Sequence, residues 1–275
     1  IYLATDTGLY WTRGNLAARA PATNWTRIEG GWPNDLPVYD AKLNRSATQL
    51  FVAVDGYGVF ATAAPHRQTD PRLVSAADYA RRAAAPGSLL SLVGARVTAA
   101  QSGDRTIPIL PSTETESQLQ VPFDLEGSSL AIQFQAGRLL DIRVPLEATA
   151  PAIFEDRDGT PMIIDADSGV LVDAGTPVRP GMRLQILATG LGKVDPAWPA
   201  GVAAPLQDAP RVVAPVRVMW DRAPVSVSRA TLAPGYVGFY VVEFEVPVVV
   251  NAGSTEMFLE VGGRASNRTR LTVLP

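Results

Sequence analysis

The sequence predicts an all-β protein, in which propeller-blade-like antiparallel hairpins are followed by two Ig-like β-sandwich domains. Three observations lead to this prediction. Short stretches alternate apolar and polar residues, 23 glycines and 23 prolines separate these stretches, and two different repeats divide the chain. The 275 residues are 47% hydrophobic and 19% charged, a composition that can fill several buried cores. The predicted parts are an incomplete blade-like segment (1–64), a linker with a short helix (65–85) and two Ig-like domains (86–149 and 150–275).

The first repeat lies within residues 1–64. IYLATDTGLYWT (1–12) returns as LFVAVDGYGVFAT (50–62) with one residue inserted in the turn, and each copy is typical of a β-hairpin. The two copies begin 49 residues apart (50 minus 1), which is close to the blade period of β-propellers. Between them, NWTRIEGGWPNDLPVYDAKLN supplies an outer strand and the first strand of the next blade. This pattern resembles BNR or sortilin-like propeller repeats, although TRGNLAARAPATNW lacks the Asp and Gly of their Asp-box.

One and a half blades cannot close a propeller, and open hairpins would have unpaired strand edges. Ile1 also begins directly in a strand pattern, which predicts a processed or truncated chain. We therefore expect either that further blades precede Ile1, or that a neighbouring chain completes the sheet. In the linker that follows, VSAADYARRAAA (74–85) is expected to be helical, with Ser75 as its N-cap and Pro86-Gly87 as its end.

The second repeat covers residues 86–275. PGSLLSLVGARV (86–97) matches PGMRLQILATGL (180–191), and residues 119–146 match residues 244–274. Each unit begins with a Pro-Gly turn and an apolar strand, and later has a strand that ends in Val-Pro and a hairpin through glycine. This plan is typical of an Ig-like sandwich. In TLAPGYVGFYVVEFEVP (231–247) the residues alternate from Phe239 onward, which predicts a strand with one face in a core.

Eight dispersed motifs of residues 72–275 resemble the Solibacter-type C-terminal domain of acidobacterial proteins. They are VSAADY, APGSLLSLVG, SQLQVPFDLEG, PAIF, PGMRLQILATGLG, PAGVAAP, TLAPGYVGFYVVEFEVP and VGGRASN. Two departures concern loops: Trp220-Asp221-Arg222 replaces a Gly-Gly hairpin, and GDRTIPILPST is shortened. The resemblance implies a secreted or cell-surface location at the end of a longer polypeptide. It brings no catalytic motif.

Composition excludes several kinds of activity. The net charge is −3, from 24 basic and 27 acidic residues without a block of like charge, so no nucleic-acid partner is expected. The absence of cysteine excludes disulfides, thiol catalysis and cysteine-ligated metals. The sequence has no run of about 18 apolar residues, so no membrane-spanning helix is predicted. The one histidine, His66, lies in a proline-flanked linker (PHRQTDP), so no catalytic residue is predicted.

Two sets of residues are candidates for binding. Asp165 and Asp167 belong to DADSG, which is similar to the first half of a calcium loop, although the closing Glu is absent and such sequences also form ordinary turns. No other cofactor is expected. The second set consists of aromatic residues that either bind glycan or protein at the surface or pack between blades. Its members are Trp11, Trp25, Trp32, Tyr57 and Trp198.

The sequence therefore predicts a non-catalytic extracellular or cell-surface protein with a structural or adhesive role. Its expected partners are other copies of the chain, or a surface polysaccharide or protein. In one version the chain is a filament or sheath subunit, completed by inter-chain strand pairing. The alternative is a C-terminal accessory or sorting tail of a secreted propeller enzyme, similar to a glycosidase or sialidase, whose active site lies upstream of residue 1.

Overall fold

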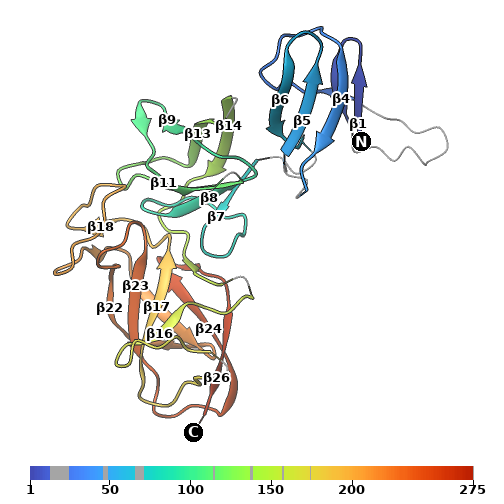
Figure 1. Cartoon of the computed structure of the whole chain (residues 1–275). Coiled ribbons are helices and arrows are strands. Elements are labelled where there is room, and N and C mark those ends of the chain that lie inside the picture. The colour runs from blue at the N-terminus through green and yellow to red at the C-terminus, as the bar shows by residue number, and fades with distance from the viewer. Residues whose placement is uncertain are drawn as a thin grey trace. The chain divides into compact units, whose positions relative to one another are not determined.

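The computed structural model describes residues 1–12, 25–45, 49–65, 71–113, 115–136, 139–156, 158–173 and 175–274. All regular structure in these ranges is β, in strands β1 to β26, and the all-β prediction is confirmed. None of these ranges contains a helix long and apolar enough to cross a membrane. The chain divides into two compact units, residues 1–71 and 72–275, drawn in blue and in green to red (Figure 1).

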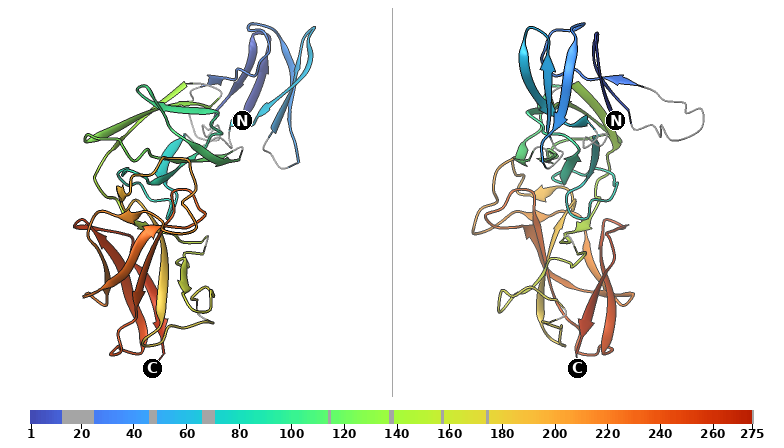
Figure 2. Two further views of the ribbon diagram at one scale, coloured as in Figure 1. Left: turned by 90° about the vertical axis from the view of Figure 1, so that its left-hand side faces the viewer. Right: turned by 45° about the vertical axis from the view of Figure 1, so that its right-hand side comes forward.

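The first unit consists of two three-stranded antiparallel sheets, β1-β2-β3 and β4-β5-β6, which Figure 2 shows as separate layers. The strands are β1 (Tyr2–Thr5), β2 (Gly8–Trp11), β3 (Thr26–Arg27), β4 (Val38–Leu43), β5 (Gln49–Val54) and β6 (Gly58–Ala63). One apolar core joins the two sheets, and its central residues include Leu9 from β2 and Leu50 and Val52 from β5. Each of these three side chains is fully buried.

The register of the two hairpins matches the sequence repeat of this unit. In β1-β2, Leu3 lies opposite Tyr10, and in β5-β6 the equivalent residues Val52 and Phe60 lie opposite each other. The other three pairs of β1-β2 also have equivalents in β5-β6, so the repeated sequences form equivalent hairpins. Whether these are propeller blades stays a prediction.

The second unit contains two β-sandwiches. The first sandwich is formed by β7 (Arg72–Ser75), β8 (Leu89–Val93), β9 (Ala99–Ser102), β10 (Arg105–Thr106), β11 (Ile109–Ser112), β12 (Glu116–Gln120), β13 (Ser129–Gln135) and β14 (Leu139–Pro145). Its sheets are β11-β12-β8-β7 and β10-β9-β13-β14. Leu92 and Leu119 from one sheet and Ile132 and Phe134 from the other are fully buried in the core between them.

The second sandwich follows from residue 150. Its strands are β15 (Ala152–Ile153), β16 (Ile163–Asp165), β17 (Arg183–Thr189), β18 (Val194–Asp195), β19 (Arg211–Val212), β20 (Val216–Trp220), β21 (Ala223–Val225), β22 (Val227–Leu232), β23 (Tyr240–Glu245), β24 (Gly253–Val261), β25 (Arg264–Ala265) and β26 (Thr269–Val273). One sheet has the order β15-β17-β23-β22-β19-β18, with β16 also on β17. The other has the order β21-β20-β24-β25, with β26 also on β24.

The two sandwiches share one topology. The order β11-β12-β8-β7 corresponds to β22-β23-β17-β15, and the order β10-β9-β13-β14 corresponds to β21-β20-β24-β26. The sequence repeat matches this correspondence, because its first segments form β8 and β17. Counted along the chain, the first sheet of the first sandwich pairs strands 1, 2, 6 and 5. Whether the two sandwiches are Ig-like stays a prediction. In β23 the alternate residues Tyr240, Val242 and Phe244 are buried, as their spacing predicts.

The helix expected over residues 74–85 is wrong. Residues Arg72–Ser75 form β7, an edge strand of the first sandwich, so Ser75 ends a strand and does not cap a helix. A turn follows, in which the Ser75 Oγ accepts from the amide of Ala77 at 3.2 Å and the Ser75 carbonyl accepts from the amide of Tyr79 at 3.1 Å. Strand pairing and these local bonds outweigh the helix propensity of the alanines.

Buried contacts join the two sandwiches. Phe123, from the segment after β12, is 8% exposed and belongs to the core of the second sandwich. The amide of Leu89 donates to Thr189 Oγ1 at 2.8 Å, and the amide of Gly201 donates to Gln120 Oε1 at 2.6 Å. Because hydrogen bonds and packing both cross this boundary, the two sandwiches form one body.

A small apolar cluster extends the same boundary. The rings of Phe154 and Phe239 stack at a centroid distance of 4.5 Å, and the cluster also contains Ala77 and Leu89 of the first sandwich. At the rim, Lys193 Nζ lies 3.0 Å from Glu126 Oε1. The lysine ammonium lowers the pKa of Glu126 by hydrogen bonding to the charged carboxylate.

Candidate functional site

The structure distributes the predicted aromatic residues over different environments. Trp32 is 9% exposed and lies in the core of the first unit, 5.8 Å from the Phe60 ring, so of the two alternatives for this residue the structure shows packing in a core. Trp11 also packs against this core. Trp25 and Tyr57 are exposed, at 37% and 58%. A binding role for the exposed pair stays a prediction.

Trp198 lies in the second unit. Its Nε1 donates to the carbonyl of Val202 at 3.1 Å, and the ring packs against the core of the second sandwich. His66 lies outside the described residues.

The carboxylates of the two aspartates predicted as calcium ligands both have partners within the protein. Asp165 Oδ2 accepts the hydroxyl of Ser168 at 2.6 Å, and Asp165 Oδ1 accepts the amide of Asp167 at 3.1 Å. These bonds, with the Ser168 hydroxyl first, lower the pKa of Asp165. The carboxylate of Asp167 pairs with Arg183. Within the described ranges, no group of three or more acidic or histidine side chains is arranged to hold a metal ion.

A hollow of about 220 Å³ lies on the first sandwich, at the end of β12. It is lined by Tyr79, Pro111, Ser112, Thr113, Glu116 and Gln118. Tyr79 is 50% exposed, and its hydroxyl donates to Glu116 Oε1 at 2.9 Å. The hollow therefore combines one oriented aromatic ring with short polar side chains and a single carboxylate.

Local structure fixes the position of Tyr79. Its φ is +54°, a left-handed conformation that a bulky side chain rarely adopts and that costs about 1–3 kcal/mol. The residue before it, Asp78, accepts the amide of Ala80 at 3.2 Å and pairs with Arg82. Hydrogen bonds before and after the tyrosine thus hold its strained backbone conformation. This conformation places the ring at the surface beside Glu116.

These groups suit a neutral, polyhydroxylated ligand. The face of a tyrosine ring packs against the C–H groups of a sugar, and carboxylate, amide and hydroxyl groups exchange hydrogen bonds with sugar hydroxyls. The hollow is smaller than the ~300–1,000 Å³ typical of pockets for drug-sized ligands. It would therefore hold one unit of an extended ligand, with the remainder outside.

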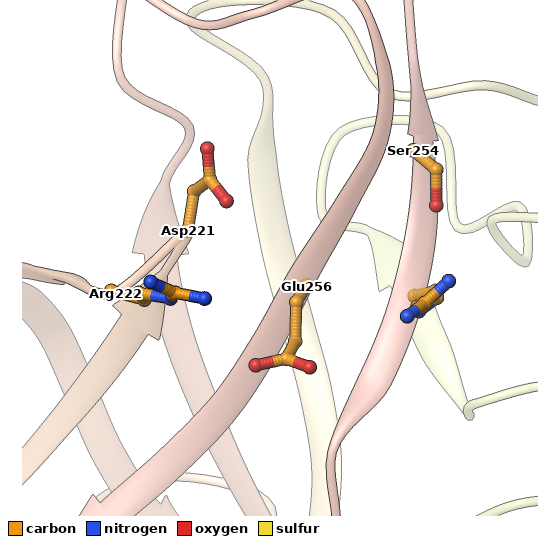
Figure 3. A pocket seen from close by; sticks show the side chains of 5 residues that line it. Asp221, Arg222, Ser254 and Glu256 are labelled. Atoms are coloured by element: carbon orange, nitrogen blue, oxygen red, sulfur yellow. The ribbon is translucent and has the colours of Figure 1, made fainter.

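A second hollow, of about 260 Å³, lies on the second sandwich at the turn between β20 and β21 (Figure 3). It is lined by Asp221, Arg222, Ser254, Glu256 and Arg270. Both turn residues have positive φ, +48° for Asp221 and +71° for Arg222, in a two-residue hairpin position that favours Asn-Gly. Glycine at these two positions would avoid this strain.

The charges of the second hollow are balanced among themselves. Glu256 pairs with Arg268 and lies opposite Arg270 in the β24-β26 register. The amide of Asp221 donates to the Glu256 carbonyl at 2.9 Å. A ligand that binds Glu256 would have to displace its ion pair with Arg268, so the Tyr79 hollow is the stronger candidate for binding.

Sequence analysis missed Tyr79 because its segment was expected to be helical. The available signal was the pair Ser75 and Asp78, both of which favour turns over helix interiors. Gly190 and Gly192 have positive φ and lie against the backbone carbonyls of residues 150 and 148.

No protein-family model matches the chain, and no curated protein is significantly similar to it. Among solved structures, it is similar to SGBP-B of the mixed-linkage glucan utilization locus of Bacteroides ovatus, in complex with a mixed-linkage heptasaccharide. The identity is 11%, the TM-score is 0.35, and the match covers 90% of this chain and 57% of that one. It is also similar to SGBP-B from a complex xyloglucan utilization locus in Bacteroides uniformis. The identity is 9%, the TM-score is 0.27, and the match covers 74% of this chain and 49% of that one.

The endo-fucoidan hydrolase MfFcnA4 of glycoside hydrolase family 107 is also similar, at 16% identity and a TM-score of 0.17, over 70% of this chain and 27% of that one. The chain spans about half the length of the two SGBP-B structures that it matches. These TM-scores do not establish a common fold, so the candidate site is interpreted from its own geometry.

Proposed function

We propose that this chain is a non-catalytic, structural and adhesive β-protein of the cell exterior, which binds polysaccharide at the Tyr79 hollow. The observation that carries the proposal is the tyrosine itself. It is half exposed, held at a positive φ, and hydrogen-bonded through its hydroxyl to Glu116. Strain of this kind persists at ligand-binding positions, because an oriented ring loses less entropy when a ligand binds.

The structural part of the proposal rests on the joined sandwiches. Phe123 packs into the second core, and the Leu89–Thr189 hydrogen bond crosses the boundary. A body without a flexible joint holds its binding surface at a fixed distance and direction from its ends. This is the mechanical property that a surface spacer requires.

The non-catalytic part rests on the chemistry of the hollows. The Tyr79 hollow contains one carboxylate, whereas most glycoside hydrolases use two carboxyl groups that flank the bond to be broken. Of the described residues that line the hollow, none is a histidine that could act as a base for the hydroxyls of Ser112 and Thr113.

The proposal is tested by native gel electrophoresis of the full chain in gels that contain soluble β-glucan, xylan or alginate. We expect a neutral polysaccharide to retard the wild type, and Tyr79→Ala to weaken binding at least tenfold, roughly 1.4 kcal/mol. Tyr236→Ala is the matched control, because Tyr236 is 62% exposed and lies in the same unit. Equal retardation of wild type and Tyr79→Ala, or none of the wild type, would contradict the proposal.

Tyr57→Ala separates this site from the aromatic surface predicted in the first unit. If Tyr57 and not Tyr79 controls retardation, the polysaccharide site lies on the first unit and the proposed site is wrong. Release of new reducing ends from any retarding polysaccharide would contradict the non-catalytic assignment.

A further inference from the structure

We propose that the first unit associates with a second copy of itself, through a sheet face that its internal repeat leaves uncovered. Each hairpin of the repeat has two faces, which we name front and back. The front faces carry Tyr2, Ala4, Leu9 and Trp11 in β1-β2, and the equivalent Phe51, Ala53, Val59 and Ala61 in β5-β6. The back faces carry Leu3 and Tyr10, and the equivalent Val52 and Phe60.

Within the unit, the front face of the first hairpin packs against the back face of the second. Leu9, a front-face residue of β2, and Val52, a back-face residue of β5, are both fully buried in the shared core. Tyr2 and Trp11 of the front face and Phe60 of the back face pack against the same core. The contact is therefore front to back, and it is built from residues that the repeat duplicates.

The front face of β5-β6 and the back face of β1-β2 are the repeat equivalents of these two buried faces, and both are exposed. Val59 is the repeat equivalent of Leu9, yet it is 70% exposed, and Phe51, the equivalent of Tyr2, is 41% exposed. On the other side, Leu3 is the equivalent of the fully buried Val52 and is 46% exposed. One apolar front face and one apolar back face thus remain in contact with water, which is unfavourable for adjacent apolar side chains.

A second copy fits this arrangement because the two uncovered faces are the two partners of the interface already formed. The front face of β4-β5-β6 in one copy would contact the back face of β1-β2-β3 in the next. Such a contact is heterologous, so it leaves one face uncovered at each end and allows further copies to add. Polar groups border the front face, where Lys42 lies directly opposite Phe51 and forms a 3.2 Å ion pair with Asp40.

Strand pairing, the mode expected from the sequence, is the competing arrangement. Within the described residues β6 pairs only with β5, and its six residues carry no charge, so its edge is also able to accept a strand. Phe51 distinguishes the two modes, because β5 is the central strand and is paired on both sides. A charge at Phe51 disturbs the face and leaves the β6 edge unchanged.

The test is sedimentation velocity of the full 275-residue chain at increasing concentration. We expect the wild type to form a concentration-dependent series of oligomers. Phe51→Asp and Val59→Asp on the front face, and Leu3→Asp on the back face, should each be monomeric. The matched control is Val249→Asp in the second unit, where an 89% exposed valine is replaced and association should persist.

Mixing the variants tests the polarity of the contact. Phe51→Asp keeps an intact back face and Leu3→Asp keeps an intact front face, so their equimolar mixture should form a heterodimer and nothing larger. Circular dichroism melting of each variant establishes that it is folded. A wild type that stays monomeric, association that survives Phe51→Asp, or a mixture that stays monomeric would each overturn the proposal. Because polysaccharide retardation is measured separately, either proposal can fail without the other.

Discussion

Single polar side chains close many turns of the second unit, and Asp165 is a clear case. Its carboxylate accepts a hydroxyl from Ser168 and an amide from Asp167 at the end of β16. Both donors favour the charged form of the carboxylate. The residue therefore contributes to stability in a way that depends on pH.

We expect the contribution of Asp165 to be lost in acid. Its folded pKa is lowered from the ordinary value of 3.8, so the bonds stabilise the fold fully above that value. As the pH falls through the lowered folded pKa, the carboxylate is protonated in both states and this contribution disappears. Urea unfolding between neutral pH and about pH 2 should show a steeper acid loss for the wild type than for Asp165→Asn.

Residue type in the sequence predicted the chemistry of side chains better than their exposure. Trp32 and Tyr57 were grouped as candidate surface aromatics, but a tertiary core buries one while a turn exposes the other. Tyr79 could not be identified as a surface residue, because its exposure depends on a positive φ directly after Asp78. Local composition does not determine such a conformation when alanines surround it.

At the scale of elements, glycines set how closely the strands and turns of the two sandwiches approach each other. Gly238 precedes β23 with a φ of +72°, and a Cβ at this position would lie 2.5 Å from Leu89 Cδ2 across the boundary. Gly169, in the turn after β16, has a similar φ of +71° but open space around it. Replacement of Gly169 by alanine would cost backbone strain alone, whereas replacement of Gly238 would add a steric clash with Leu89.

We expect Gly238→Ala to destabilise the second unit by about 2–4 kcal/mol, because backbone strain and overpacking add. Gly169→Ala should cost only about 1–2 kcal/mol, since strain alone acts there. The difference between their urea midpoints measures the packing part. Equal midpoints would show that Leu89 moves aside without cost.

Repeats and alternation predicted most elements. The hairpins of residues 1–12 and 50–62 have matching registers, and the segments 86–97 and 180–191 form equivalent strands of two sandwiches. Period-two patterns persist because each of these strands has one face in a core. The segment 74–85 was misassigned, because its first residues pair with β8 through contacts that lie 15 or more residues away in sequence.

At the scale of the whole molecule, the second unit contains two large cores, and the core of the second sandwich includes a side chain from the first sandwich. Phe123 is the side chain that leaves one sandwich for the core of the other. Because Phe123 of the first sandwich is buried in the core of the second, the stabilities of the two sandwiches are coupled. The sequence repeat alone would suggest two independent domains.

We expect the second unit to unfold as one cooperative body, and Phe123→Ala to divide this transition. Removal of the ring should cost about 3–5 kcal/mol and uncouple the sandwiches. Ile132→Ala, a truncation confined to the first core, should destabilise without uncoupling. Hydrogen exchange of β8 and β17 checks this: the two strands should open together in the wild type and in Ile132→Ala, and separately in Phe123→Ala. Joint opening in all three proteins would contradict the prediction.

The stacked rings of Phe154 and Phe239 limit where this polypeptide can be cut for recombinant expression. A fragment that begins at residue 150 would expose both rings and the part of the second core that Phe123 covers. Such a product should aggregate, although the repeat makes residue 150 look like a natural cloning boundary. Residues 72–275 form one compact unit and retain both sides of this boundary.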